Sequence, residues 1–511
     1  MKFLRPICAI ALFAALSCGA QKIDPITQAV LKGYTEILDK NPKDYETLYE
    51  RASQYLQLGM YPEAMTDAQN ALKFTPQKNS DLRESEYSML ASASAALGDY
   101  NAALEAINNA LALSPSNYLN VYKKGNILLE LNRPDEAYRT FSAMQSLKSR
   151  SQEAYYGMAK ACIRQGNFSE AETLMKEIET AAPTNPQTFC RLGNLFEEMN
   201  QPENAAANYI VAISMDNRGN AGLQELTNLA STNYKAVASA LDFAIDKSSN
   251  KPMMLFLKGS LANRAGAYSD AETCFSRLST LPDGNTAGVY AALAEARFAQ
   301  NELPNAIEAV NKAIAIKPSA ANLALKADIE LAMDNTYGAI ADATEAMRAD
   351  ANDIDAYLAA AKAYIQAGKG KEATDVLNQA VMLNPDNTLA LLLRAYTNQE
   401  LNNNPKAATG DFNRIILEEA SSFPAITIKA IAQSKTGKKL DADDGVKNAL
   451  DSNTTPEDLY WAAVYYAQTG NLDRAKELAD KAVYDGYMNK HMLKSSHTPW
   501  LNLSPIAHLI K

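Results

Sequence analysis

Residues 357–385 read YLAAAKAYIQAGKGKEATDVLNQAVMLNP. Apolar residues recur in this stretch at the three- and four-residue spacing of amphipathic helices. Gly368 separates two such patterns, and a glycine readily takes the positive φ that ends a helix. Pro385 closes the stretch, because a proline cannot continue a helix. The stretch therefore predicts a hairpin of two helices.

The same pattern recurs along the chain. Gly98, Asn132, Gly166 and Asn200 are turn residues that follow one another at steps of 34. Twelve such turns are followed five places later by alanine and preceded seven places earlier by glycine or alanine. The twelve turns are Gly59, Gly98, Asn132, Gly166, Asn200, Gly266, Asn301, Asp334, Gly368, Asn402, Gly437 and Gly470. Small residues at fixed offsets let paired helices approach closely, so the period predicts stacked helical hairpins.

These positions resemble those of the tetratricopeptide repeat (TPR) family, a 34-residue helix-turn-helix with fixed large, small, aromatic, alanine and proline positions. The stretch from Tyr87 to Pro115 fits that signature as closely as residues 357–385 do. The resemblance implies an all-α superhelical solenoid of about 12–13 hairpins that binds a partner protein or peptide in a concave groove. The family's clamp for a C-terminal carboxylate is not carried over, because its lysines are missing here.

The repeat also divides the chain into segments. We expect a capping helix in 21–44, hairpins 1–5 in 45–218, a degenerate hairpin in 219–251, hairpins 7–13 in 252–489 and a C-terminal cap in 490–511. In the degenerate hairpin Asn233 keeps the turn, but Leu226 stands where a small residue is expected, which predicts a weak joint. The apolar residues of the C-terminal segment are expected to cover the last hairpin: Met492, Leu493, Trp500, Leu501, Leu503, Ile506 and Leu509.

Residues 1–20 have the layout of an export signal. Lys2 and Arg5 precede an apolar run over residues 7–16, which is too short to span a bilayer. Two cleavage sites remain open: one after Ala20, and one before Cys18 in a lipobox-like stretch that would place a lipid on Cys18. A buried N-terminal helix is the third interpretation. The export signal predicts a bacterial protein that is periplasmic or anchored in the cell envelope.

Composition excludes several classes of function. The 511 residues carry a net charge of −10, whereas a nucleic-acid binder needs a basic face. The three histidines lie near the C-terminus, and His491 and His497 have no acidic or cysteine partner nearby in sequence. We therefore expect no metal, no cofactor and no transmembrane helix. Cys162, Cys190 and Cys274 are expected to be buried thiols.

Candidate binding residues follow from the register of the repeat. First helices line the concave side of such an array, and the positions ten, six and two places before each turn should face it. In hairpins 3–5 we predict a partner-binding face made of Tyr122, Asn126, Glu130, Tyr156, Lys160, Arg164, Asn194 and Glu198. Lys160 and Arg164 should favour an acidic segment of the partner. The alternative is a solvated groove, or one that another part of the array fills.

Three functions are compatible with the sequence. The first is a non-enzymatic interaction scaffold of the bacterial envelope, and the second is a periplasmic chaperone-like binder of transient peptide clients. The third is an enzyme with a site in the C-terminal tail, which would have to rely on His491 or His497. The repeats occupy nearly the whole chain and leave no room for a catalytic domain, which disfavours the third function; the first is the main hypothesis and the second its alternative.

Overall fold

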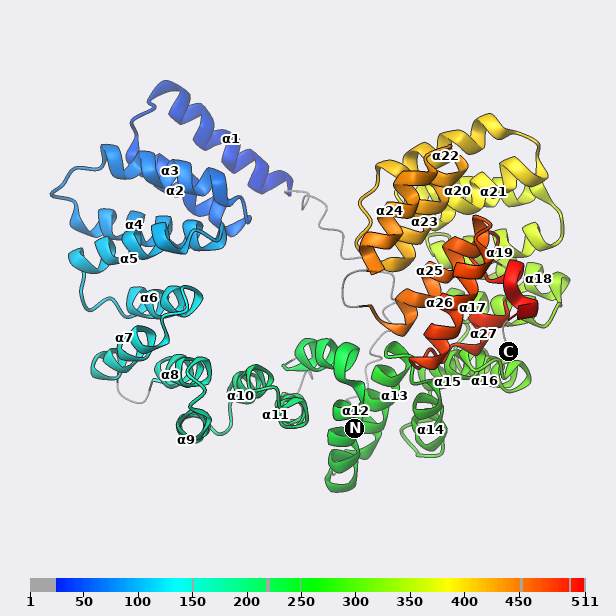
Figure 1. Cartoon of the computed structure of the whole chain (residues 1–511), viewed down its shortest axis with the longest axis horizontal. Coiled ribbons are helices and arrows are strands. Elements are labelled where there is room, and N and C mark those ends of the chain that lie inside the picture. The colour runs from blue at the N-terminus through cyan, green and yellow to red at the C-terminus, as the bar shows by residue number, and fades with distance from the viewer. Residues whose placement is uncertain are drawn as a thin grey trace. The chain divides into compact units, whose positions relative to one another are not determined.

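The structure is a computed structural model that describes residues 24–148, 151–216, 221–248, 250–450, 454–495 and 498–509. These residues form helices and the turns that connect them (Figure 1). The predicted export signal, with Cys18 and both cleavage sites, lies outside the described residues, as does His497. No described helix is both long enough and apolar enough to cross a membrane.

The α-helices are α1 (Pro25–Lys40), α2 (Tyr45–Gln57), α3 (Tyr61–Phe74), α4 (Ser80–Ala96), α5 (Tyr100–Leu113), α6 (Tyr118–Glu130), α7 (Pro134–Leu147), α8 (Gln152–Arg164), α9 (Phe168–Ala181), α10 (Pro186–Glu198), α11 (Pro202–Met215), α12 (Leu223–Lys247), α13 (Lys251–Arg264), α14 (Tyr268–Ser279), α15 (Ala287–Ala299), α16 (Leu303–Ile316), α17 (Ala320–Ala332), α18 (Thr336–Ala349), α19 (Ile354–Gln366), α20 (Gly370–Leu383), α21 (Thr388–Tyr396), α22 (Pro405–Leu417), α23 (Phe423–Lys435), α24 (Lys439–Leu450), α25 (Pro456–Gln468), α26 (Leu472–Tyr484) and α27 (Lys490–Lys494). A π-helical turn, η1 (Thr397–Leu401), and a 3₁₀ helix, η2 (Ser504–Leu509), complete the set.

The predicted hairpins are confirmed. From α2 to α11 and from α13 to α26, consecutive helices pair with one another, and each pair encloses one of the predicted turns (Figure 1). Side-chain caps start many of these helices. The Ser151 hydroxyl, for example, accepts a hydrogen bond from the Ala154 N–H at the start of α8, and Thr455 and Asp458 form a reciprocal capping box at α25.

Eleven of the predicted turn residues take positive φ, from 55° at Asn132 to 88° at Gly470. The exception corrects the sequence-based register. Asn402 has a φ of −101°, and its neighbour Asn403 is the left-handed residue, with a φ of 49°. The π-helical turn η1 lies just before it and absorbs one extra residue. Ala408, 1% exposed, therefore takes the buried position that the sequence assigned to Ala407.

Small residues at the predicted positions let the helices of each hairpin approach closely. In three hairpins the small residue is glycine, and an aromatic ring fills the space that a side chain would take. A Cβ built on Gly193 would lie 2.3 Å from the Tyr209 ring, and one on Gly259 would lie 2.8 Å from the Phe275 ring. Gly125 faces Phe141 in the same way. These glycines are therefore required by packing and not by backbone conformation.

The stacking of the hairpins defines an inner side. The first helix of each hairpin contacts the first helix of the next, as α6 does with α8 and α23 with α25. Second helices make no contact of similar extent with one another within the described ranges. Because the first helices contact one another more extensively than the second helices do, each unit curves toward its first helices. We call the residues ten, six and two places before each turn the inner face.

The described residues divide into two compact units, which we call the N-terminal unit (24–244) and the C-terminal unit (245–509). The boundary falls inside α12, the predicted degenerate hairpin. Asn233, with a φ of −134° and a ψ of 47°, breaks the helical backbone there, as its turn position predicted. Leu226, the large residue at a small position, is fully buried, so this hairpin packs in its own way.

Candidate functional site

The N-terminal inner face is built on three consecutive first helices, α6, α8 and α10. Tyr156 on α8 is hydrogen-bonded to the Asn194 side chain on α10. Asn194 is held in turn by the Tyr209 hydroxyl, which donates to its Oδ1 at 2.7 Å. Tyr122 on α6 packs its ring 5.9 Å from that of Phe141. The ring and amide positions are therefore set by contacts within the array.

Lys160 joins the same cluster. Its Nζ lies 2.9 Å from Glu198 Oε1 and 5.8 Å from the centroid of the Tyr156 ring. Burial raises the pKa of Tyr156 and keeps its hydroxyl neutral, while the bond to Glu198 holds Lys160 charged. The structure therefore brings Tyr156, Lys160, Asn194 and Glu198 together, as the register predicted.

The remaining predicted residues are less constrained. Glu130 and Arg164 are exposed, Asn126 is half-buried, and the described residues offer none of them a hydrogen bond or an ion pair. Lys160 and Arg164 do not form the expected basic pair. Glu198 neutralises Lys160, so Arg164 is the positive charge of the two that remains available to a partner. Cys190, the other residue in this register, is 3% exposed and belongs to the core.

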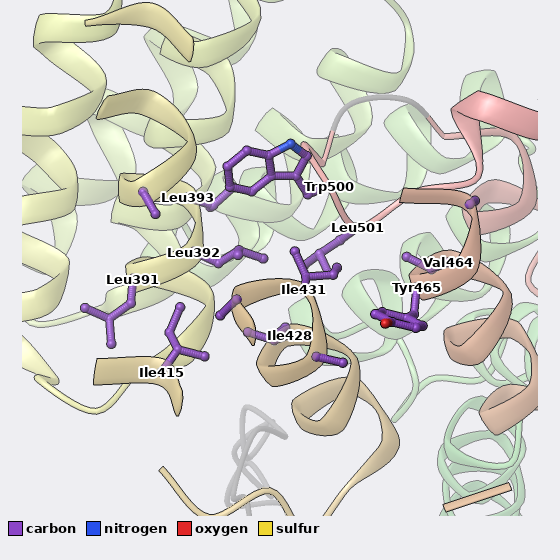
Figure 2. Close-up of a cluster of buried hydrophobic side chains, with 14 of the residues drawn as sticks. Leu391, Leu392, Leu393, Ile415, Ile428, Ile431, Val464, Tyr465, Trp500 and Leu501 are labelled. Carbon is purple, nitrogen blue, oxygen red and sulfur yellow. The ribbon is translucent and has the colours of Figure 1, made fainter. Parts of the chain in front are cut away.

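The C-terminal inner face carries a covering segment. We call the described residues 487–495 and 498–509 the tail. Trp500 of the tail packs against Tyr396 of α21, with ring centroids 5.0 Å apart, and against Phe412 of α22 at 5.8 Å. Lys435 of α23 places its Nζ 4.3 Å from the Trp500 ring centroid. Figure 2 shows Trp500 beside Leu392 and Leu393 of α21, and Leu501 beside Ile431 of α23.

Polar contacts also hold the tail. Gln468 of α25 donates from Nε2 to the backbone carbonyl of Asn502 at 2.7 Å. The Tyr460 hydroxyl donates to the Met492 carbonyl at 3.2 Å, and the Tyr460 ring stacks on Tyr487 with centroids 4.7 Å apart. Tyr460 and Gln468 occupy inner-face positions of the last hairpin, so the tail lies on that face.

The tail extends further than the sequence predicted. It covers the last hairpin through η2 and the preceding Leu503, and Leu503 and Ile506 are fully buried, but Trp500 reaches two hairpins farther back. Its short helix α27 contacts α15, where the His491 ring lies 4.0 Å from that of Phe298. Leu509, at 36% exposed, stays at the surface.

Sequence reasoning missed this second face, although the sequence contains a signal for it. Six places before the turn, the residue is polar in the hairpins from α2 to α20, apart from the degenerate one at α12, and becomes apolar in the last three hairpins. The polar residues are Ser53, Ser92, Asn126, Lys160, Asn194, Ser260, Glu295, Asp328 and Lys362. The apolar ones are Ile431, Val464 and Tyr396, and the position of Tyr396 is counted from the predicted turn at Asn402 because the π-helical turn η1 follows it. An inner face that turns apolar needs a cover.

The described residues offer no group of three or more His, Cys, Asp or Glu side chains placed to hold a metal ion. Cys162, Cys190 and Cys274 are buried in helices, and burial raises the pKa of Cys162 and Cys190 to about 11.

The fold first defines the class, a helical repeat protein built of stacked hairpins. Family models described as tetratricopeptide repeats match residues 88–150, 128–188 and 330–396. A relative, the TPR repeat-containing protein MJ1428 of Methanocaldococcus jannaschii, is 24% identical over 447 residues, which make up 85% of this chain and 74% of that protein. The chain therefore contains tetratricopeptide repeats.

Two solved structures are similar to this chain at low sequence identity and low TM-score. Yeast Tom70 is 14% identical and superposes with a TM-score of 0.37, over 81% of this chain and 100% of that one. The Cut9–Hcn1 hetero-tetramer of APC/C is 14% identical, with a TM-score of 0.33, over 90% of this chain and 96% of that one.

Proposed function

We propose that the protein is a non-enzymatic interaction scaffold of the bacterial cell envelope, and that the N-terminal inner face binds a segment of a partner protein. The observation that carries this proposal is the alignment of Tyr122, Tyr156 and Asn194 on three consecutive first helices, tied by the contacts described above. The tail covers the corresponding face of the last three hairpins of the C-terminal unit, whereas the N-terminal inner face offers polar side chains to a partner.

The chemistry of this face suits an extended or helical segment. Tyrosine rings give contact area at a low cost in side-chain entropy, and the amide of Asn126 can bond to a partner's backbone. Because Glu198 already neutralises Lys160, the acidic partner group is expected at Arg164. Glu130, exposed on α6, would favour a basic group at the other end.

Site-specific photocrosslinking in the native host tests this proposal. A benzophenone amino acid at Glu130 or Arg164 should form a discrete protein adduct, whereas one at Tyr337, which is 80% exposed on α18, should not. The Tyr122→Ala/Tyr156→Ala variant should weaken the adduct at Glu130, and the control variant Tyr337→Ala/Tyr484→Ala should not. Equal adducts at all three positions would show that the face has no special role.

The envelope location rests on residues 1–20 alone. Mass spectrometry of the mature protein tests it. A chain that begins at Gln21 would identify simple cleavage and a periplasmic protein, and a lipid on Cys18 would identify membrane anchoring. An intact Met1 in the native host would contradict export.

A further inference from the structure

The residues that contact Trp500 and its neighbour have the features of a binding site. We call this site, formed by Tyr396, Phe412, Lys435 and Gln468, the Trp500 seat. Rings from the two helices of one hairpin flank the indole, at 5.0 Å for Tyr396 and 5.8 Å for Phe412, and the Lys435 ammonium of the next hairpin lies over it at 4.3 Å. Trp500 is 8% exposed. Burial lowers the pKa of Lys435, which shows that its ammonium is partly withdrawn from water. Ring contacts and a cation over the ring face both favour an aromatic side chain, and the cation–π contact is strongest for an indole.

The neighbouring contact recognises backbone. Gln468 Nε2 donates to the Asn502 carbonyl at 2.7 Å, a bond that any extended segment could accept. The Trp500 seat therefore combines an anchor for one side chain with a polar group that fixes the chain direction. Peptide-binding surfaces use the same combination: hydrogen bonds to the peptide backbone give affinity, and a pocket for one side chain gives specificity.

The segment that fills the seat is held in an unfavourable backbone conformation. The Leu501 N–H donates to the Thr498 carbonyl at 3.1 Å, which closes a tight turn with Pro499 at its second position. Trp500 follows with a φ of 59°, where turns of this kind favour glycine or asparagine. A bulky residue at positive φ is strained, and such strain gathers at functional sites. We call residues 498–502 the Trp500 turn.

The flanks of the Trp500 turn are anchored separately. On the C-terminal side, Leu503 and Ile506 are fully buried, and η2 packs on α25 and α26. On the N-terminal side, α27 contacts α15. The Trp500 turn can therefore leave its seat while both flanks stay in place, and its release relieves the strain at Trp500.

We propose that the Trp500 turn is an intramolecular occupant of a second peptide-binding site, and that a partner segment carrying a tryptophan followed directly by an aliphatic residue displaces it. The partner supplies the same indole and aliphatic side chain without the constraint of a turn. This site lies in the C-terminal unit and does not depend on the function proposed for the N-terminal inner face.

A competition experiment on the full chain tests this proposal. The probe is a fluorescein-labelled peptide with the sequence of residues 498–503, TPWLNL, measured by fluorescence polarisation. Trp500→Ala empties the seat, so the peptide should bind this variant about ten-fold or more tightly than wild type. The control variant Trp461→Ala removes the other tryptophan, on α25, and should bind the peptide as wild type does. A peptide with alanine in place of tryptophan should not bind.

Equal affinity for wild type and Trp500→Ala, or no binding to the folded variant, would overturn the proposal. If Trp500→Ala fails to fold, hydrogen exchange on wild type decides instead. Amides of residues 500–502 should exchange about 100-fold or more faster than those of α25, and equal protection would identify a permanent cap. Tyr122→Ala/Tyr156→Ala should leave peptide affinity unchanged, which separates a failure here from a failure of the N-terminal inner face.

Discussion

The N-terminal and C-terminal units use the same register of inner-face positions in opposite ways. In the N-terminal unit, Lys160 pairs with Glu198 of the next hairpin, and Asn194 accepts a hydrogen bond from Tyr209 of its own hairpin. In the last three hairpins of the C-terminal unit, Ile431 and Val464 stand at the same positions and the tail packs on them. The comparison teaches that the residue type six places before the turn determines whether an inner face can remain open to solvent.

The largest expected effect comes from overpacking one hairpin in each unit. Gly193→Leu and Gly259→Leu force a side chain into the rings of Tyr209 and Phe275, and each should reduce the free energy of unfolding by about 1–3 kcal/mol or more. Hydrogen exchange should show lost protection mainly in the altered hairpin and its neighbours, since contacts in the array are local. Uniform loss across both units would contradict the separation into two units.

A second pair of variants tests the shifted hairpin that underlies Trp500. Ala408→Leu should lower the free energy of unfolding by about 1–3 kcal/mol, because Ala408 is 1% exposed. Ala407→Leu should cost about 0.5 kcal/mol or less, because this residue is only half-buried. Chemical denaturation of the two variants measures the difference. If Ala407→Leu destabilised the protein more than Ala408→Leu, the register would be unshifted and the turn would lie at Asn402.

The C-terminal unit should also respond to pH through a carboxyl pair. Burial and the hydrogen bond to Asp342 raise the pKa of Glu330 to about 7 from 4.5. Its neutral form therefore stabilises the fold below pH 4.5, and this stabilisation is lost as the pH rises through 7. Glu330→Gln should match wild type at pH 4.5 and unfold at a higher temperature at pH 8. If the unfolding temperatures of Glu330→Gln and wild type differed by the same amount at pH 4.5 and pH 8, titration of Glu330 would be excluded as the cause.

The smallest effect on stability is expected from the polar cluster of the N-terminal inner face. Lys160→Ala/Arg164→Ala should change the free energy of unfolding by about 1 kcal/mol or less, since Arg164 is exposed and the single ion pair of Lys160 with Glu198 remains in contact with solvent. It should weaken partner binding mainly through the association rate, with a reduced dependence on salt. Lys312→Ala, which breaks an exposed pair with Glu308 in the C-terminal unit, is the matched control. Unchanged binding by the double variant would exclude this cluster.

The sequence was sufficient to predict the hairpins, because a period of fixed small residues and turns reports directly on helix pairing. It could not reveal the shift at Asn403, since a π-helical turn leaves the spacing of Ala395 and Ala407 intact while moving the buried alanine to 408. The pairing of Lys160 with Glu198 could not be predicted either, because these two residues lie on different hairpins and meet only through the way the hairpins stack.

The tail was only partly predictable. Its apolar residues indicated that it covers something, and the nearest surface in sequence is the last hairpin. Trp500 instead reaches Tyr396, about 100 residues earlier in the chain, because curvature of the array brings α21 near the tail. The change from polar to apolar residues six places before the turn was the available signal, and it has to be read across all hairpins at once.

The pairing of glycine with an aromatic ring inside single hairpins has a consequence for how such arrays evolve. Gly193 and Tyr209, or Gly259 and Phe275, are complementary shapes on the two helices of one hairpin. Joining the first helix of one hairpin to the second helix of another would place a ring against an alanine, or leave a void beside a glycine. Recombination that duplicates or exchanges repeats should therefore succeed when its breakpoints fall between hairpins, and a transplanted ring should carry its glycine with it.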